Sequence, residues 1–523
     1  MKKKLMLMLS AVLLLTSCSG GGGSNANIEF TDNYGNSYPI QTDKTLTVWC
    51  EFPESALKGA NNFNDLPLAK QLEKETGIHI EYIHPSDATG ESFNLMLASG
   101  ELPDIIMSKW CQFPGGGDKA VTDGYILPLN EIVKKYSPDF SAALDNYDAR
   151  KYFSTDEGEL FFYPGIWDYD AVNTSGFMLR KDWLDELGLE VPETIDEWEH
   201  VLREFKDKKG ATAPFTSTFQ PFYEGGFSGA YGFKLDFYIE DDEIKNGYAH
   251  PEYKTMLETI IRWRDEGLFD KNFSTMDQGT MITNMLTGKT GAIYGAQGSV
   301  MGNIMAAATE KGYDLVAAPY PSLVKGEQCT MAKKQTQAIS QMGAAITTQC
   351  KDVELAARWL NYGYTNAGRL AYAFGIEGES YEMIDGEPVY TDYVMNNPDG
   401  IGVKNMLDRY TRSATTSGPF IKAWGYLKQY AKLPQQKHAL DIWSDLDGEP
   451  TEIPPLYFSE EEQTVVSERL NSITTYQKEM FYKFINKSEP LENFDKYLKT
   501  LEELGNNEIL EIYNAAYQRY LKR

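Results

Sequence analysis

The sequence predicts an α/β protein with more than one domain and a helical region at its carboxyl end. With 523 residues, the chain is longer than one ordinary hydrophobic core can organise. Residues 46–107 alternate strand and helix patterns, which is typical of βαβ units built on a parallel sheet. Residues 459–520 carry helical patterns, beginning with the capping box of Ser459 and Glu462 and separated at Gly505.

The first domain is predicted from the alternation in residues 46–107. Strands are expected at 46–49, 78–83 and 102–107, with a helix from Pro67 to Gly77 and a short helix that ends at Gly100. In sheets of this kind ligands lie beyond the carboxyl ends of the strands. That rule selects Glu51, Phe52, Ser86 and Trp110 as candidate ligand-binding residues.

The middle of the chain shows its clearest pattern between Glu159 and Phe205. A strand is expected at 159–163 and is expected to stop at Pro164-Gly165, because proline lacks a ladder donor. A loop with Trp167, Asp168 and Tyr169 leads to a strand at 175–179. Thr194 and Glu197 form a capping box before a helix that reaches Phe205. Further along, the pattern predicts helices at 253–266 and 353–360 and strands at 315–320 and 343–348.

The amino terminus has the pattern of an export signal. Residues 1–17 combine three lysines with an apolar run, and they end before Cys18. The tetrad Leu15 to Cys18 resembles the bacterial lipobox, in which the cysteine carries a lipid, so residues 18–43 are expected to be a lipid-anchored, flexible linker. A plain secretory signal with an incidental cysteine is the alternative. No other stretch has the roughly 18 apolar residues of a spanning helix.

Charge and cysteine content exclude several classes of function. The formal charge is −27, which argues against nucleic acid or anionic lipid as a partner. Besides Cys18 the chain has Cys50, Cys111, Cys329 and Cys350, none in the spacing of a zinc site, so neither a metal nor a cofactor is expected. Cys50 and Cys111 each follow a predicted strand, and whether they form a disulfide is left open.

Three motifs in order resemble the family 1 extracellular solute-binding proteins of ABC importers, which include the maltose-binding proteins. They are Gly158 to Pro164, Arg180 to Asp182, and Leu187 to Glu197; residues 97–106 and 281–297 resemble further family patterns. The resemblance implies a two-lobed periplasmic-binding-protein-like fold of the class II type, with several interlobe crossings. The expected lobes are 44–165 plus 340–400, and 166–339 plus 401–523, the second with the carboxyl-terminal helices.

The resemblance also implies where a ligand binds. Residues 214–233 resemble the loop in which maltose-type proteins place a sugar-stacking ring, and residues 281–297 carry Gln297 where the family has a tryptophan. The candidates from these and neighbouring segments are Trp167, Asp168, Gln220, Phe222, Tyr223, Phe227, Tyr294, Gln297, Tyr320 and Trp424. The alternative for the rings of the 214–233 loop is a place in the core.

The expected function is that of a receptor, not of an enzyme. By resemblance the protein is a monomer on the extracellular face of the cell membrane, where it captures a sugar or oligosaccharide by lobe closure and delivers it to the permease of an ABC importer. A lipoprotein that binds peptides or another small solute is the first alternative. A secreted glycoside hydrolase is the second; it would need two carboxylates about 5–9.5 Å apart across a cleft.

Overall fold

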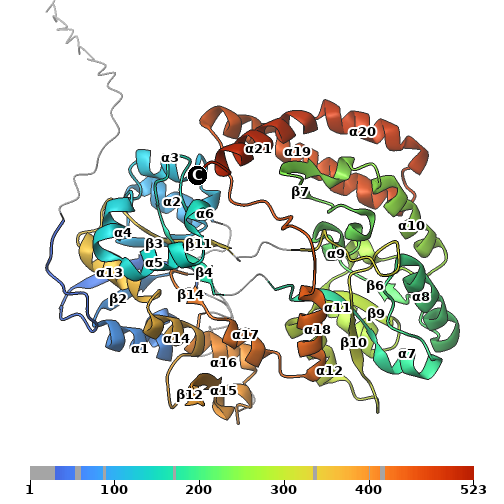
Figure 1. The fold of residues 1–523 in the computed structure, drawn as a ribbon, viewed down its shortest axis with the longest axis horizontal. Helices are drawn as coiled ribbons and strands as arrows, with labels where there is room; N and C mark the ends of the chain where they lie inside the picture. The colour runs from blue at the N-terminus through green and yellow to red at the C-terminus, as the bar shows by residue number, and fades with distance from the viewer. Residues whose placement is uncertain are drawn as a thin grey trace, which may run out of the picture.

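The computed structural model describes residues 30–52, 60–85, 90–168, 172–333, 339–399, 401–412 and 418–523. They form two lobes side by side, with the helices of the carboxyl-terminal region lying over the second lobe (Figure 1). Cys18 and Ser86 lie outside the described residues. No helix in the described ranges has the length and apolar character needed to cross a membrane.

The first lobe is built on a six-stranded sheet in the order β14-β4-β11-β3-β1-β2. The strands are β1 Thr45–Trp49, β2 His79–Ile83, β3 Ile105–Ser108, β4 Tyr163–Trp167, β11 Ile339–Ile346 and β14 Ile421–Lys422. β1 pairs in parallel with β2 and β3, as the βαβ pattern predicts, whereas β11 runs antiparallel to β3 and β4. The helices are α1 Pro67–Thr76, α2 Glu91–Ser99, α3 Gly116–Thr122, α4 Asn130–Tyr136, α5 Pro138–Asn146, α6 Arg150–Phe153, α13 Val353–Tyr362, α14 Asn366–Phe374, α15 Asp392–Met395, α16 Val403–Tyr410 and α17 Trp424–Tyr430, with a hairpin of β12 Tyr381–Ile384 and β13 Glu387–Tyr390.

The second lobe has a four-stranded sheet in the order β10-β5-β9-β6. Its strands are β5 Ser175–Arg180, β6 Phe215–Thr216, β9 Ala292–Ala296 and β10 Leu315–Ala318, beside a hairpin of β7 Phe237–Glu240 and β8 Glu243–Asn246. Its helices are α7 Lys181–Leu187, α8 Ile195–Lys209, α9 Gln220–Tyr223, α10 Tyr253–Asp265, α11 Gln278–Leu286, α12 Gly302–Ala307, α18 Pro434–Ser444, α19 Glu460–Ile485, α20 Phe494–Glu503 and α21 Asn506–Tyr520. Short 3₁₀ turns lie at 63–65, 110–112, 228–231, 247–249, 273–275 and 491–493, and a π turn at 297–301.

Helix α8 begins as its sequence predicts. The Thr194 hydroxyl accepts a hydrogen bond from the Glu197 backbone N–H at 3.2 Å, and the Glu197 carboxylate accepts one from the Thr194 N–H at 3.3 Å. Together these bonds satisfy two of the donors that a helix start leaves unpaired. The buried face of α8 is formed by Ile195, Trp198, Val201, Leu202 and Phe205, the predicted helical spacing.

The strand expected at 159–163 is wrong, because Pro164-Gly165 does not end a strand but lies within β4. Pro164 pairs with Gly343 of β11, next to a register shift that separates the Gly343 pair from the Ile339 pair. A proline is tolerated at such an irregularity, since the ladder there does not require its missing N–H.

The lobe boundary also differs from the expected one. The expected boundary places residues 401–430 in the second lobe. In the structure, however, β14 pairs in parallel with β4, and α16 packs against α1, both in the first lobe. The last passage of the chain from the first lobe to the second therefore lies between α17 and α18 and not at residue 401. Helices α19 to α21 belong with the second lobe, whose core includes Val466, Ile473 and Phe481.

Residues 445–459, called here the interlobe segment, connect α18 with α19 along the space between the lobes (Figure 1). At one end Thr451 donates its hydroxyl to the carbonyl of Met331 at 3.0 Å in the second lobe. At the other end Tyr457 is buried in the core of the first lobe, against Phe161. Gly116 allows this approach, since a Cβ there would lie 3.0 Å from the Tyr457 ring.

Candidate functional site

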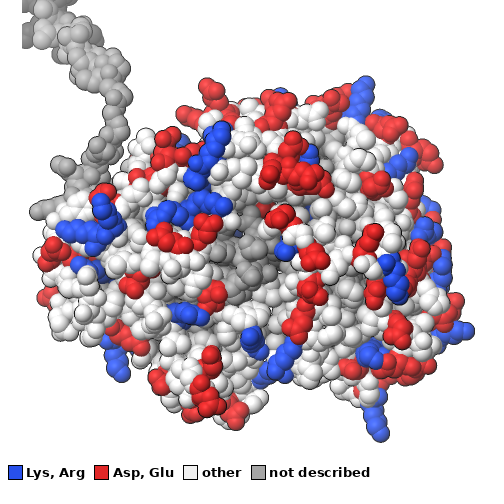
Figure 2. All heavy atoms as spheres, in the orientation of Figure 1, with Lys and Arg blue, Asp and Glu red and all other residues white. Residues whose placement is uncertain are grey.

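Two cavities lie between the lobes on either side of the interlobe segment, and the surface is hollowed between the lobes (Figure 2). The first, of about 510 Å³, is lined by Cys111 of the first lobe, by Tyr223, Glu224, Lys234, Asp236 and Phe237 of the second, and by 452–456, Phe458 and Tyr513. The second, of about 680 Å³, is lined by Lys151, Tyr152, 239–242, Thr330, Met331, 448–451, Pro454, Tyr517, Tyr520 and Leu521. Pro454 borders both, so we treat them together as the interlobe groove.

Aromatic side chains form much of the groove wall. Tyr223 at the end of α9 is 41% exposed, which leaves a ring face open to the first cavity. Phe237 of β7 stacks on Tyr513 of α21 with ring centroids 5.1 Å apart. In the second cavity Tyr517 and Tyr520 stack at 6.1 Å. Flat apolar faces beside polar groups are typical of sites for small ligands.

The polar floor of the first cavity is organised by Glu224, a residue that sequence reasoning missed. Its carboxylate accepts hydrogen bonds from the Tyr294 hydroxyl at 2.8 Å and from the Gln220 amide at 3.2 Å. Burial, with Tyr320 and Glu224 nearby, raises the pKa of Tyr294 well above its ordinary value, so the phenol remains a donor. The Glu224 carboxylate is therefore held in place by two predicted residues, Gln220 and Tyr294.

Several predicted residues of the second lobe lie in the core and not in the groove. The rings of Phe222, Phe227 and Tyr320 are buried, which is the alternative that the sequence left open for the two phenylalanines. Tyr320 donates its hydroxyl to the Ser175 carbonyl at 2.6 Å. Gln297 is buried at the start of the π turn, and its side-chain oxygen has no hydrogen-bond partner among the residues that the structure describes.

Three predicted residues that follow strands β1 and β3 of the first lobe, Trp110, Phe52 and Glu51, differ in their exposure. Trp110 is fully buried and donates its indole N–H to the Ile106 carbonyl at 3.0 Å, whereas its neighbour Cys111 lines the groove. Phe52 is half-buried and packs against Phe63 with ring centroids 4.9 Å apart, and Glu51 beside it is exposed. The Phe52 ring thus packs against its own lobe, and the role of these residues in ligand binding stays a prediction.

Trp167, Asp168 and Trp424 do come together, at the ends of β4 and β14 where the chain leaves the first lobe. The Asp168 carboxylate accepts the backbone N–H of Trp424 at 2.7 Å and forms an ion pair with Arg369. The Lys422 amino group lies 4.7 Å from the centre of the Trp167 ring, and burial lowers the pKa of Lys422 to about 8. The bond between Asp168 and Trp424 links residues 256 positions apart in the sequence.

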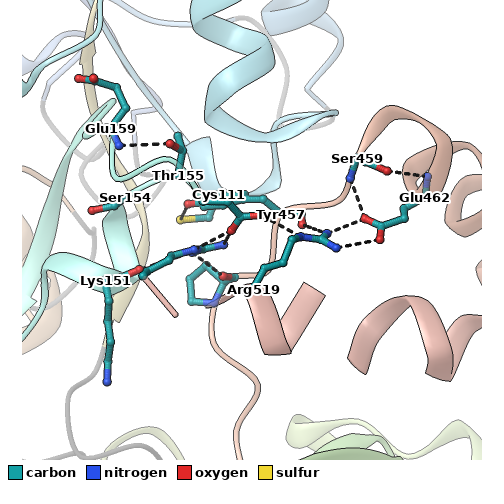
Figure 3. Close-up of polar contacts among 12 residues, drawn as sticks. Cys111, Lys151, Ser154, Thr155, Glu159, Tyr457, Ser459, Glu462 and Arg519 are labelled. Atoms are coloured by element: carbon teal, nitrogen blue, oxygen red, sulfur yellow. Dashed lines mark hydrogen bonds and ion pairs between the residues drawn. The ribbon is translucent and has the colours of Figure 1, made fainter. Parts of the chain in front are cut away.

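The cysteines of the described residues are free, so Cys50 and Cys111 are not bonded to each other. Burial raises the pKa of each of these two thiols to about 12. The Cys111 sulfur instead lies 3.9 Å from the Tyr457 hydroxyl (Figure 3). Among the described residues, no group of three or more His, Cys, Asp or Glu is arranged to hold a metal ion.

One end of the groove is bordered by a set of charged residues, Asp156, Glu462, Arg519 and Arg523, called here the Asp156 cluster. Arg519 of α21 donates to Asp156 at 2.9 Å, to Glu462 at 2.6 Å and to the Tyr457 carbonyl at 3.0 Å (Figure 3). Arg523 donates to Asp156 at 2.8 and 2.6 Å. The cluster thus joins the carboxyl-terminal helices of the second lobe to the 154–158 turn of the first.

The comparisons agree with this architecture. Residues 65–369, more than half of the chain, match the sequence model of the family "Bacterial extracellular solute-binding protein". The chain belongs to this family. The fructooligosaccharide ABC transporter substrate-binding protein FusA of Streptococcus pneumoniae is 23% identical over 93% of this chain and 92% of its own. Lipoprotein LipO of Bacillus subtilis is 25% identical over 86% of this chain and 89% of its own. Among solved structures, the alginate-binding protein AlgQ2 superposes with a TM-score of 0.71 at 22% identity, over 92% of this chain and 100% of its own, which shows the shared two-lobed fold.

Two parts of the groove in this solute-binding protein, Glu224 and the interlobe segment, could not be predicted from the sequence pattern. Glu224 directly follows the predicted Tyr223, so the loop was found but its carboxylate was not. The interlobe segment has three prolines, Pro450, Pro454 and Pro455, which mark an extended stretch without saying which lobes it contacts.

Proposed function

We propose that this solute-binding protein is a lipid-anchored extracellular receptor of an ABC importer, and that it captures an oligosaccharide between its lobes. The observation that carries the proposal is an aromatic groove lined from both lobes. In support, the chain aligns over nearly its full length with a fructooligosaccharide-binding relative. The names of the relatives differ in the sugar, so they leave the class of oligosaccharide open.

The groove offers the two kinds of contact that an oligosaccharide needs. The exposed face of Tyr223 can pack against the apolar face of a sugar ring, while the Glu224 carboxylate can accept hydrogen bonds from sugar hydroxyls. Because the two walls belong to different lobes, rotation of one lobe toward the other would enclose the ligand.

The proposed location follows from the amino terminus and the family. Cys18 would carry the lipid, and the glycine- and serine-rich residues 19–27 would act as the tether to the lobes. The tether is shorter than the expected 18–43 linker, because Thr31 and Asn33 already bond to Glu354 of the first lobe, at 2.6 and 2.9 Å. We expect Cys18→Ala to move the protein from the membrane fraction to the medium. A variant that stays in the membrane fraction would contradict the lipid anchor at this residue.

Binding is tested with the purified full-length protein in a detergent without sugar groups, by isothermal titration and tryptophan fluorescence. The panel contains fructooligosaccharides, α-galactosides, maltooligosaccharides, oligogalacturonides and peptides of three to six residues. We expect saturable binding of one oligosaccharide class and no release of reducing ends on long incubation. Tight binding of a peptide without response to any sugar would contradict the proposal, and steady release of reducing ends would favour a hydrolase.

A further inference from the structure

The walls of the interlobe groove carry an excess of negative charge. In the first cavity Glu224, Asp236 and Glu452 face a single lysine, Lys234. In the second cavity Glu240, Asp241, Asp242 and Glu449 face Lys151. Acids therefore outnumber lysines seven to two along the groove, against 76 to 49 for acids and bases in the whole chain. The lining of the groove is thus richer in acids relative to bases than the chain as a whole.

Local structure fixes several of these carboxylates. Asp241 and Asp242 occupy the turn of the β7–β8 hairpin with φ of 51° and 57°, a conformation in which aspartate is among the better tolerated residues. Asp236 directly precedes β7 and accepts the Phe237 backbone N–H at 2.8 Å. The backbone of the hairpin thus fixes the positions of Asp236, Asp241 and Asp242, and their short side chains keep the carboxylates near it.

The groove disfavours the binding of a ligand that carries further negative charge. Burial raises the pKa of Asp236, and burial together with the Asp241 carboxylate raises the pKa of Glu240. A neutral sugar presents hydroxyl donors, which carboxylates accept readily, whereas a uronic acid adds a carboxylate on each ring. Figure 2 shows acidic side chains along the second-lobe side of the hollow.

We infer that the groove selects neutral oligosaccharides and excludes those made of uronic acids. The inference rests on the proposed function, because it assumes that the ligand is an oligosaccharide in this groove.

The test uses pairs of ligands that differ only in charge. The panel of neutral oligosaccharides and oligogalacturonides is screened first, and the ligand that binds is then converted to its charged or uncharged counterpart. A neutral ligand is converted by oxidation of its primary hydroxyls to carboxylates, and a uronic ligand by reduction of its carboxyl groups. We expect a neutral binder whose oxidised form binds about tenfold or more weakly, because like charges repel across the groove. The affinity of the oxidised form should rise with added salt, since salt screens the repulsion, while that of the neutral form should not.

A charge variant locates the effect. Asp242→Asn removes one negative charge from the groove and keeps the side-chain shape that suits positive φ, and Glu258→Gln removes one from the exposed face of α10. Asp242→Asn should raise the affinity for the oxidised form relative to the neutral form severalfold, and Glu258→Gln should leave both affinities unchanged. A binder that is uronic, or an oxidised form that binds as well as the neutral one, overturns the inference and leaves the proposed function standing. Absence of binding by any sugar overturns both.

Discussion

Asp156→Asn should destabilise the protein by about 2 kcal/mol, between the roughly 0–1 kcal/mol of an exposed ion pair and the roughly 3–5 kcal/mol lost when a buried one is broken. Asparagine keeps the size of the side chain and one acceptor oxygen but removes the charge. The Arg523 side chain is 1% exposed and Asp156 is 25% exposed, so this pair lies nearer the buried case. Besides Asp156, Arg523 donates to the carbonyls of Lys151 and Pro455, each at 3.4 Å, which are weak replacements for a carboxylate.

Urea unfolding followed by tryptophan fluorescence gives the free energy of unfolding of each variant. The matched control is Asp145→Asn, which breaks an exposed pair: Arg150 is 45% and Asp145 64% exposed, with 3.0 Å between them. We expect the control to change the free energy of unfolding by less than about 1 kcal/mol. Equal effects of the two substitutions would refute the reasoning, because burial of Arg523 would then make no difference.

Three further predictions concern the groove, the core of the second lobe and strand β14. Tyr223→Ala should weaken oligosaccharide binding about tenfold with little change in stability. The control Tyr393→Ala removes another exposed ring, outside the groove lining, and should change neither the affinity nor the stability. Titration measures the affinity of each variant, and urea unfolding measures its stability. Phe222→Ala should cost about 3–5 kcal/mol of stability because its ring is buried in the second-lobe core, and a smaller loss in urea would contradict that placement. Lys422→Met should stabilise the protein at pH 7 by up to about 3 kcal/mol, because the pKa of Lys422 is about 8 in the folded state against 10.5 in the unfolded state. The gain in stability should shrink as the pH rises from 8 to 10.5. A gain that does not change with pH would contradict the prediction.

Local sequence signals predicted local structure well. The Thr194 and Glu197 capping box and the apolar spacing after it define α8, because both depend on residues that are neighbours along one helix. Pro164 misled the strand prediction because its effect depends on the partner strand, and the register shift in β11 is not visible in the sequence around Pro164. The predicted strands 46–49 and 78–83 were found, since each buries residues at a simple alternating period.

Long-range pairing accounts for what the sequence did not predict. β14 has two residues, too few for any periodic signal, yet its pairing with β4 places residues 401–430 in the first lobe. Trp424 was predicted as a candidate without a partner, and only the fold shows that its backbone N–H meets Asp168. Trp110 and Cys111 illustrate the finer limit: adjacent residues at a strand end point to opposite environments, the core and the groove.

The interlobe segment sets a limit on how far the groove can open. Thr451 is held to the second lobe by bonds from its hydroxyl to the Met331 and Lys333 carbonyls, and Tyr457 is buried in the first lobe. Five residues lie between these two anchors, so the six Cα-to-Cα steps from Thr451 to Tyr457 span at most about 22 Å when fully extended. Pro454 and Pro455 lie within this stretch and favour an extended backbone, so the segment has little slack to give up. As long as both anchors hold, the lobes can rotate relative to each other but cannot separate widely at the interlobe segment.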